Sequence, residues 1–166
     1  MSFLSVEKVT YALEALLMFL NISKESQSLP PESAEQIRKR SLELLQKLGA
    51  GEVDSLVAAK ELNEIVEQMN QSLKAPYPFL MTDSAEEFVK GEIVAFEHYL
   101  SQELRAHHLN AHQEASLFND SLRLWEQVGI DLSAREGISE FNAIIEKLNR
   151  LLPEEEHYPT PDEEQY

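Results

Sequence analysis

Residues 6–20, VEKVTYALEALLMFL, decide the fold because their apolar side chains recur along one side of a helix. The spacing of these side chains matches the 3.6-residue turn of an α-helix, in which residues three and four apart share a face. The stretch therefore predicts a helix that buries one face in a core. The apolar positions are Val6, Val9, Leu13, Leu16 and Leu20.

The same spacing recurs in every later segment, so we expect an all-α protein of about five helices packed as an antiparallel bundle. No segment alternates with period two over a useful length, which predicts that there is no sheet. We expect no internal sequence repeat beyond this shared spacing, which is generic to helices packed side by side. The predicted helices cover about 6–20, 34–48, 52–73, 84–128 and 134–152.

The segment 84–128 contains no proline and would be about 67 Å long as one unbroken helix, at 1.5 Å per residue. A compact bundle has no use for a helix of that length, so we expect a break near 118–121, where Asn119 or Asp120 can cap a new helix. Without a break, the overhanging part is expected to pair with a second copy of the chain as a homodimer. The last positions of the predicted apolar stripe are Phe118, Leu122 and Trp125.

The length of the chain suits one ordinary domain, and we expect a single helical-bundle domain over 1–152. Pro153 ends this predicted body. The remaining segment, PEEEHYPTPDEEQY at 153–166, contains three prolines and six acids and has little apolar content. Such a composition predicts a flexible, disordered acidic tail.

Net charge is the strongest compositional feature, because 14 Lys and Arg oppose 30 Asp and Glu and give −16. The six acids of the tail leave −10 on residues 1–152, so the body is acidic by itself. Such a surface repels nucleic-acid phosphates and anionic lipids, and we expect neither direct nucleic-acid binding nor membrane binding.

Two further features narrow the classes of protein. The chain has no cysteine, which excludes disulfides, thiolate nucleophiles and Cys-ligated zinc. The most apolar stretch, YALEALLMFLNI at 11–22, is too short to cross a bilayer and contains Glu14. We therefore interpret this stretch as a core helix and expect a cytoplasmic protein.

The stretch HHLNAHQE, 107–114, holds three of the five histidines and suggests a metal site. On a helix, residues four apart share a face, which pairs His108 with His112 and Glu103 with His107. A metal ion needs three or four ligands, and one helix supplies at most two of them at this spacing, so facing helices would have to complete the set. Exposed and partly buried histidines, with no cofactor, are the simpler interpretation. The candidate metal ligands are Glu103, His107, His108 and His112.

The stretch RAHHLNAH, 105–112, resembles the Arg-x(4–6)-His spacing of the HEPN family of helical ribonucleases. The resemblance implies a helical bundle in which Arg105 and His112, supplied across a dimer, take part in RNA cleavage. It covers eight residues, and Ala106 stands where the family usually has a polar residue. The acidic body also opposes RNA binding.

Composition and elimination favour a non-enzymatic acidic protein-binding module that engages a basic partner protein. Inhibitors, immunity proteins, secretion chaperones and adaptors belong to this class. A metal- or ligand-binding helical bundle that uses the histidine cluster at 107–112 is the second hypothesis. A HEPN-like ribonuclease is the third, and a scaffold with an apolar dimer interface along 84–128 is the fourth.

Overall fold

The computed structural model describes residues 4–22, 28–74, 77, 84–100 and 109–166. This part of the chain contains six α-helices, two 3₁₀ turns near the C-terminus and no strand beyond an isolated bridge. The prediction of an all-α fold is therefore confirmed. None of the described helices combines the length and the apolar character that a bilayer crossing requires. The elements are α1 (Val6–Ile22), α2 (Pro31–Gly49), α3 (Ser55–Asn70), α4 (Ala85–Leu100), α5 (Ala111–Gln127), α6 (Ala134–Asn149), η3 (Glu154–Glu156) and η4 (Glu163–Gln165).

The structure corrects two predictions. The described residues form six α-helices where about five were expected, and they form no single long helix over 84–128. Helix α5 runs unbroken through 118–121, where a break was expected, and the described part of 84–128 forms two helices, α4 and α5. A capping box begins α5: the Gln113 N–H donates to Oδ1 of Asn110 at 2.8 Å, and the Asn110 N–H donates to Oε1 of Gln113 at 3.0 Å. Neither helix has the overhanging part that was expected to pair with a second copy as a homodimer. Residues 101–108 lie outside the described residues.

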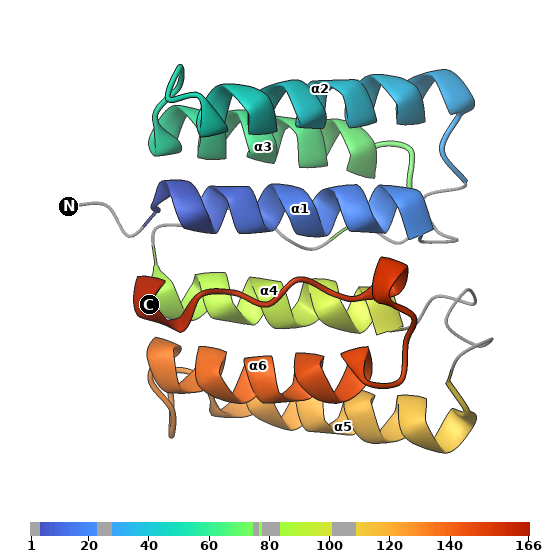
Figure 1. Cartoon of the computed structure of the whole chain (residues 1–166), viewed down its shortest axis with the longest axis vertical. Coiled ribbons are helices and arrows are strands. Elements are labelled where there is room, and N and C mark those ends of the chain that lie inside the picture. The colour runs from blue at the N-terminus through green and yellow to red at the C-terminus, as the bar shows by residue number, and fades with distance from the viewer. Residues whose placement is uncertain (1–3, 23–27, 75–76, 78–83, 101–108) are drawn as a thin grey trace.

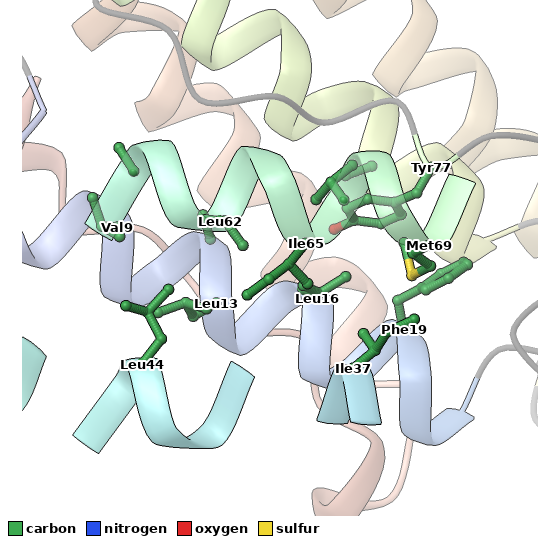
Figure 2. Packing of buried hydrophobic residues seen from close by; sticks show 14 of the residues in the cluster. Val9, Leu13, Leu16, Phe19, Ile37, Leu44, Leu62, Ile65, Met69 and Tyr77 are labelled. Atoms are coloured by element: carbon green, nitrogen blue, oxygen red, sulfur yellow. The ribbon is translucent and has the colours of Figure 1, made fainter. Parts of the chain in front are cut away.

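The helices form two three-helix units that lie side by side (Figure 1). The first unit is α1–α3 and the second is α4–α6, with α1 and α4 in contact in the middle. Consecutive helices within a unit are antiparallel, whereas α1 and α4 run in the same direction. Each unit has its own hydrophobic core. Figure 2 shows the first core, in which Leu13 and Leu16 of α1 pack with Leu44 of α2 and with Leu62 and Ile65 of α3.

The two units repeat one structural design, and the expectation of no internal sequence repeat stays a prediction. Ser41 in α2 and Ser121 in α5 are both fully buried, and each hydroxyl donates to the carbonyl four residues earlier, at 2.7 and 2.9 Å. Each unit also turns between its second and third helices on a left-handed glycine, Gly51 with φ 74° and Gly129 with φ 86°. Other buried pairs lie about 80 residues apart; all of them are apolar, and two of the five are identical. They are Val9 and Val89, Leu13 and Ile93, Leu16 and Phe96, Leu44 and Leu124, and Met69 and Leu148.

The C-terminal segment 153–166, which we call the strap, does not confirm the expected disordered tail. It runs back from the end of α6 to the end of the molecule where α4 begins (Figure 1). Tyr158 is 3% exposed and Pro161 is buried. The tyrosines and prolines of the segment supply apolar surface for packing, although its many acids make its average composition polar. This packing leaves the single domain over 1–152 untested, and that boundary stays a prediction.

Replacing Gly137 with alanine is expected to destabilise the protein. A Cβ at Gly137, in the first turn of α6, would lie 2.8 Å from Cγ2 of Val128 and 3.5 Å from Cγ1 of Val89. Overpacking of this kind costs about 1–3 kcal/mol, while alanine gains about 1 kcal/mol of helix propensity. We therefore expect a net loss of about 1 kcal/mol in urea unfolding. Gly49→Ala is the matched control, because nothing lies within 4 Å of its Cβ, and equal midpoints for the two variants would contradict the prediction.

Candidate functional site

The predicted metal ligands fall largely outside the described residues. Glu103, His107 and His108 lie there, as does Arg105 of the Arg-x(4–6)-His pattern. His112 is described, and its side chain is exposed in the first turn of α5. Within the described ranges, no group of three or more His, Asp and Glu side chains lies in a position to hold a metal ion. The metal site and the ribonuclease site therefore both stay predictions.

Negative charge is concentrated in the second half of the chain. Residues 85–166 carry eighteen acids against six Lys and Arg, whereas 1–84 carry twelve acids against eight. The formal charges are therefore −12 and −4. Because like charges in one region add to a common field, the second unit and the strap present the stronger anionic surface. The exposed acids among the described residues of this half are Glu86, Glu87, Glu126, Asp131, Glu136, Glu140, Glu146, Glu154, Glu155, Asp162, Glu163 and Glu164.

Many of these exposed acids gather at one end of the second unit, where α4 and α6 begin, α5 ends and the strap finishes (Figure 1). The start of α4 lies against the turn between α5 and α6, since a Cβ at Gly129 would be 3.7 Å from Cγ of Glu86. We call this surface the acidic end. Its acids are Glu86, Glu87, Glu126, Asp131, Glu136, Asp162, Glu163 and Glu164.

Helix termini favour negative charge at the acidic end. Glu86 and Glu87 lie in the first turn of α4 and Glu136 in the first turn of α6, where the positive end of a helix dipole favours negative charge. The Ser133 N–H donates to Oε1 of Glu136 at 3.1 Å. This backbone hydrogen bond, together with one from the Ser133 side chain, lowers the pKa of Glu136 below its ordinary value.

Apolar side chains are exposed at the same end of the molecule. Ile130, in the turn between α5 and α6, is 80% exposed and is followed directly by Asp131. Leu56 and Val57 lie in the first turn of α3, which also begins at this end, and they are 54% and 53% exposed. An exposed apolar residue surrounded by charge resembles the centre and rim of a protein interface.

A fully buried carboxyl lies where the two units meet. Glu92 in α4 is 0% exposed, and neither of its carboxyl oxygens has a hydrogen-bond partner within the described structure. It shares a helix face with Phe88 and Ala95, which pack in the core of the first unit. Burial raises the pKa of the Glu92 carboxyl well above its ordinary value. Burial also raises the pKa values of four tyrosines on neighbouring segments, and a charge on Glu92 would raise them further. They are Tyr11, Tyr77, Tyr158 and Tyr166.

A small cavity lies beside two of these tyrosines, Tyr11 and Tyr166. The cavity beside the tyrosine cluster holds about 20 Å³, which is enough for about one water molecule, and it lies under the end of the strap. Its lining includes Lys8, Tyr11 and Tyr166, and the Lys8 ammonium lies 5.1 Å from the centre of the Tyr166 ring. A buried carboxyl that has no hydrogen-bond partner in the described structure, such as that of Glu92, affects the stability of the fold.

The strap lies in a groove that the two units form together. Side chains from three helices donate hydrogen bonds to its backbone carbonyls. Tyr99 Oη in α4 donates to the Glu156 carbonyl at 2.6 Å, and Tyr11 Oη in α1 donates to the Pro159 carbonyl at 2.9 Å. From α6, the side-chain amide of Asn142 donates to the Pro161 carbonyl at 2.9 Å.

At the centre of the groove, Asn149 binds both backbone groups of one residue of the strap. Its Nδ2 donates to the Tyr158 carbonyl at 2.9 Å, and its Oδ1 accepts from the Tyr158 N–H at 2.8 Å. The Tyr158 ring is buried against Phe96 and Tyr99, with ring centres 5.1 and 5.0 Å apart. The groove thus combines main-chain recognition with one deep side-chain anchor.

Comparison with protein-family models, with curated proteins and with solved structures finds no match for this chain. Its two notable surfaces, the acidic end and the strap groove, are therefore interpreted from their own residues. Sequence reasoning found the excess of negative charge but not where it gathers, because the acids come from four separate segments. It missed the groove, although an Asn and a later Tyr-Pro occur in both halves of the sequence.

Proposed function

We propose that this protein is a non-enzymatic acidic protein-binding module whose acidic end engages a basic partner protein. The observation that supports the proposal is the gathering of acids from four segments at the end of the second unit where Ile130 is exposed. Opposite charge accelerates the encounter and selects the partner, while the apolar centre supplies affinity once water is expelled. We propose the cytoplasm as the place of this encounter.

The proposal covers inhibitors, immunity proteins, chaperones and adaptors, because all of these use a charged surface to recognise a specific protein. A partner that suits the acidic end has Lys and Arg around a small apolar contact point. At this end the hydrogen bond from the Ser133 N–H holds the Glu136 carboxylate in place, so this side chain loses little freedom when a partner binds. Such preorganisation favours recognition of a folded basic protein over loose association with any polycation.

Neutralising the acidic end is expected to weaken binding to a basic protein by about tenfold or more at low salt. The test variant carries Glu86→Gln, Glu87→Gln and Asp131→Asn, and the probe is cytochrome c, whose surface is rich in lysine. The affinity of the unaltered chain is expected to fall steeply between about 50 and 200 mM salt, because exposed charges are screened beyond about 8 Å at physiological ionic strength. Fluorescence titration at several salt concentrations measures both effects.

The matched control removes the same number of charges from exposed positions of the first unit, as Glu32→Gln, Glu43→Gln and Glu67→Gln. We expect the control to bind the probe within about threefold of the unaltered chain, since it lies away from the acidic end. Equal weakening by both variants would show that only total charge counts, and the proposed site would then be wrong. A complex that salt does not affect would be equally unfavourable to it.

A further inference from the structure

The contacts of the strap are those of a bound peptide rather than those of a chain end lying on a surface. Four groove side chains make five hydrogen bonds to the backbone of four residues of the strap. These side chains are Tyr11, Tyr99, Asn142 and Asn149. The side chains Glu154 and Glu155 are exposed. Binding in this groove therefore depends mainly on an extended backbone and a few apolar side chains, and one acid adds a contact, because Nδ2 of Asn142 donates to Oε1 of Glu163 at 3.4 Å.

The buried side chains of the strap define the sequence that fits. Tyr158 fills the aromatic pocket, and Pro161, three residues later, is also buried. Proline at 159 and 161 favours an extended backbone, and the carbonyls of such a backbone are free to accept because it makes no internal hydrogen bonds. The sequence pattern that fits the groove is therefore Tyr-Pro-x-Pro.

The first unit contains the same recognition device. Asn70 ends α3 as Asn149 ends α6, and it binds Tyr77 in the same way, with Nδ2 donating to the Tyr77 carbonyl at 2.9 Å and Oδ1 accepting from the Tyr77 N–H at 2.7 Å. The Tyr77 ring packs on Phe19, with ring centres 4.8 Å apart. Proline follows both tyrosines in the sequence. A three-helix unit of this design thus binds a Tyr-Pro segment each time it occurs.

The two copies of the device differ in how their occupant is attached. Tyr77 belongs to the connection between α3 and α4, so the chain holds it at both sides. Tyr158 belongs to the strap, which follows α6, and no described α-helix lies beyond it. Because a cis occupant competes at a high effective concentration, an unattached ligand gains access when the strap opens.

We propose that the groove between α1, α4 and α6 is a binding site for extended Tyr-Pro-x-Pro peptides, which the strap occupies in cis and a second peptide segment occupies in trans. The site is separate from the acidic end, so an experiment can disprove one of the two proposals without affecting the other. Opening of the strap is the local event that makes the site available.

The test uses the full-length chain and a fluorescein-labelled peptide of residues 153–166. Tyr158→Ala weakens the cis occupant and leaves the groove side chains intact, so this host is expected to bind the peptide at least about tenfold more tightly than the unaltered host. Adding Asn149→Ala to the same host removes the backbone contacts and is expected to abolish that gain. A peptide carrying Tyr158→Ala is the ligand control and is expected not to bind. Equal binding by the two hosts, when both show native helical circular dichroism, overturns the proposal.

Hydrogen exchange of the unaltered chain tests the opening step without any variant. The Tyr158 amide, which donates to Asn149, is expected to exchange faster than the amides in the middle of α6 and with little dependence on urea, as local opening requires. Exchange of Tyr158 only through global unfolding would mean that the strap never leaves its groove, and the proposal would be wrong. A concentration-dependent dimer that Asn149→Ala abolishes would support the site and identify the trans ligand as the strap of a second copy.

Discussion

Replacing Glu92 with leucine is expected to raise the free energy of unfolding by about 1–3 kcal/mol near neutral pH. The Glu92 carboxyl is fully buried between the two units, and neither oxygen has a hydrogen-bond partner within the described structure. A polar group in this position loses its hydration on folding and gains no bond in return. Leucine has a similar size and packs with Phe88 and Ala95, which share its helix face.

The same carboxyl makes stability depend on pH in a defined direction. Burial raises the pKa of Glu92 in the folded protein, whereas the unfolded chain keeps the ordinary value of 4.5. Below that value Glu92 is protonated in both states and contributes nothing to the pH dependence. Above it the unfolded state releases the proton first, so stability falls by about 1.4 kcal/mol per pH unit until the folded pKa is reached. The tyrosines near Glu92 do not contribute to the pH dependence in this range, because their pKa values are all raised above the ordinary value of 10.0. These tyrosines are Tyr11, Tyr77, Tyr158 and Tyr166.

Urea unfolding from about pH 4 to pH 8 measures this dependence for the unaltered chain, Glu92→Leu and Glu92→Gln. The glutamine variant is the matched control, because it keeps the shape and polarity of the side chain and cannot ionise. The difference in stability between the unaltered chain and Glu92→Gln is expected to widen as the pH rises above 4.5. Parallel curves for the two proteins would show that Glu92 keeps an ordinary pKa, and the burial argument would be wrong.

The sequence predicted helices well and predicted their phase poorly where a helix begins without an obvious signal. The apolar stripe of 84–128 was extended as one helix and assigned Phe118, Leu122 and Trp125 to the core. The structure instead buries Leu117, Ser121 and Leu124 and leaves Leu122 and Trp125 exposed. The capping box at Asn110 restarts the helix and sets a new phase, so an error of one residue turned the predicted face outward.

The acidic end and the strap groove were also only partly predictable from the sequence, for a different reason. Net charge is additive along a chain, so the acidic character was predictable, but its gathering at one end depends on which helix termini meet in space. The strap has the composition of a disordered tail. Its order comes from hydroxyl and amide donors on α1, α4 and α6, which lie far from it in the sequence, and no local pattern reveals them.

Tyr77→Ala is expected to lower the free energy of unfolding by about 3–5 kcal/mol, the loss typical of a buried aromatic side chain. Tyr77 is 2% exposed, and its ring packs on Phe19 in the core of the first unit (Figure 2). Its hydroxyl is buried and has no hydrogen-bond partner in the described structure. Tyr77→Phe is therefore the matched control, because it keeps the ring, removes the unbonded hydroxyl and is expected to be at least as stable as the unaltered chain.

Tyr158→Ala removes an equivalent ring from the second unit, yet its effect on the helices is expected to be smaller. Where the strap opens as a unit, a substitution within it lowers the stability of the helices by no more than the free energy with which the strap docks. Tyr77 has no such limit, since its segment joins α3 to α4 and is held on both sides. Circular dichroism during urea unfolding should therefore show a large shift of the helical transition for Tyr77→Ala and a smaller one for Tyr158→Ala. Equal shifts would show that the strap is an integral part of the second core and that the two copies of the device serve the same structural purpose.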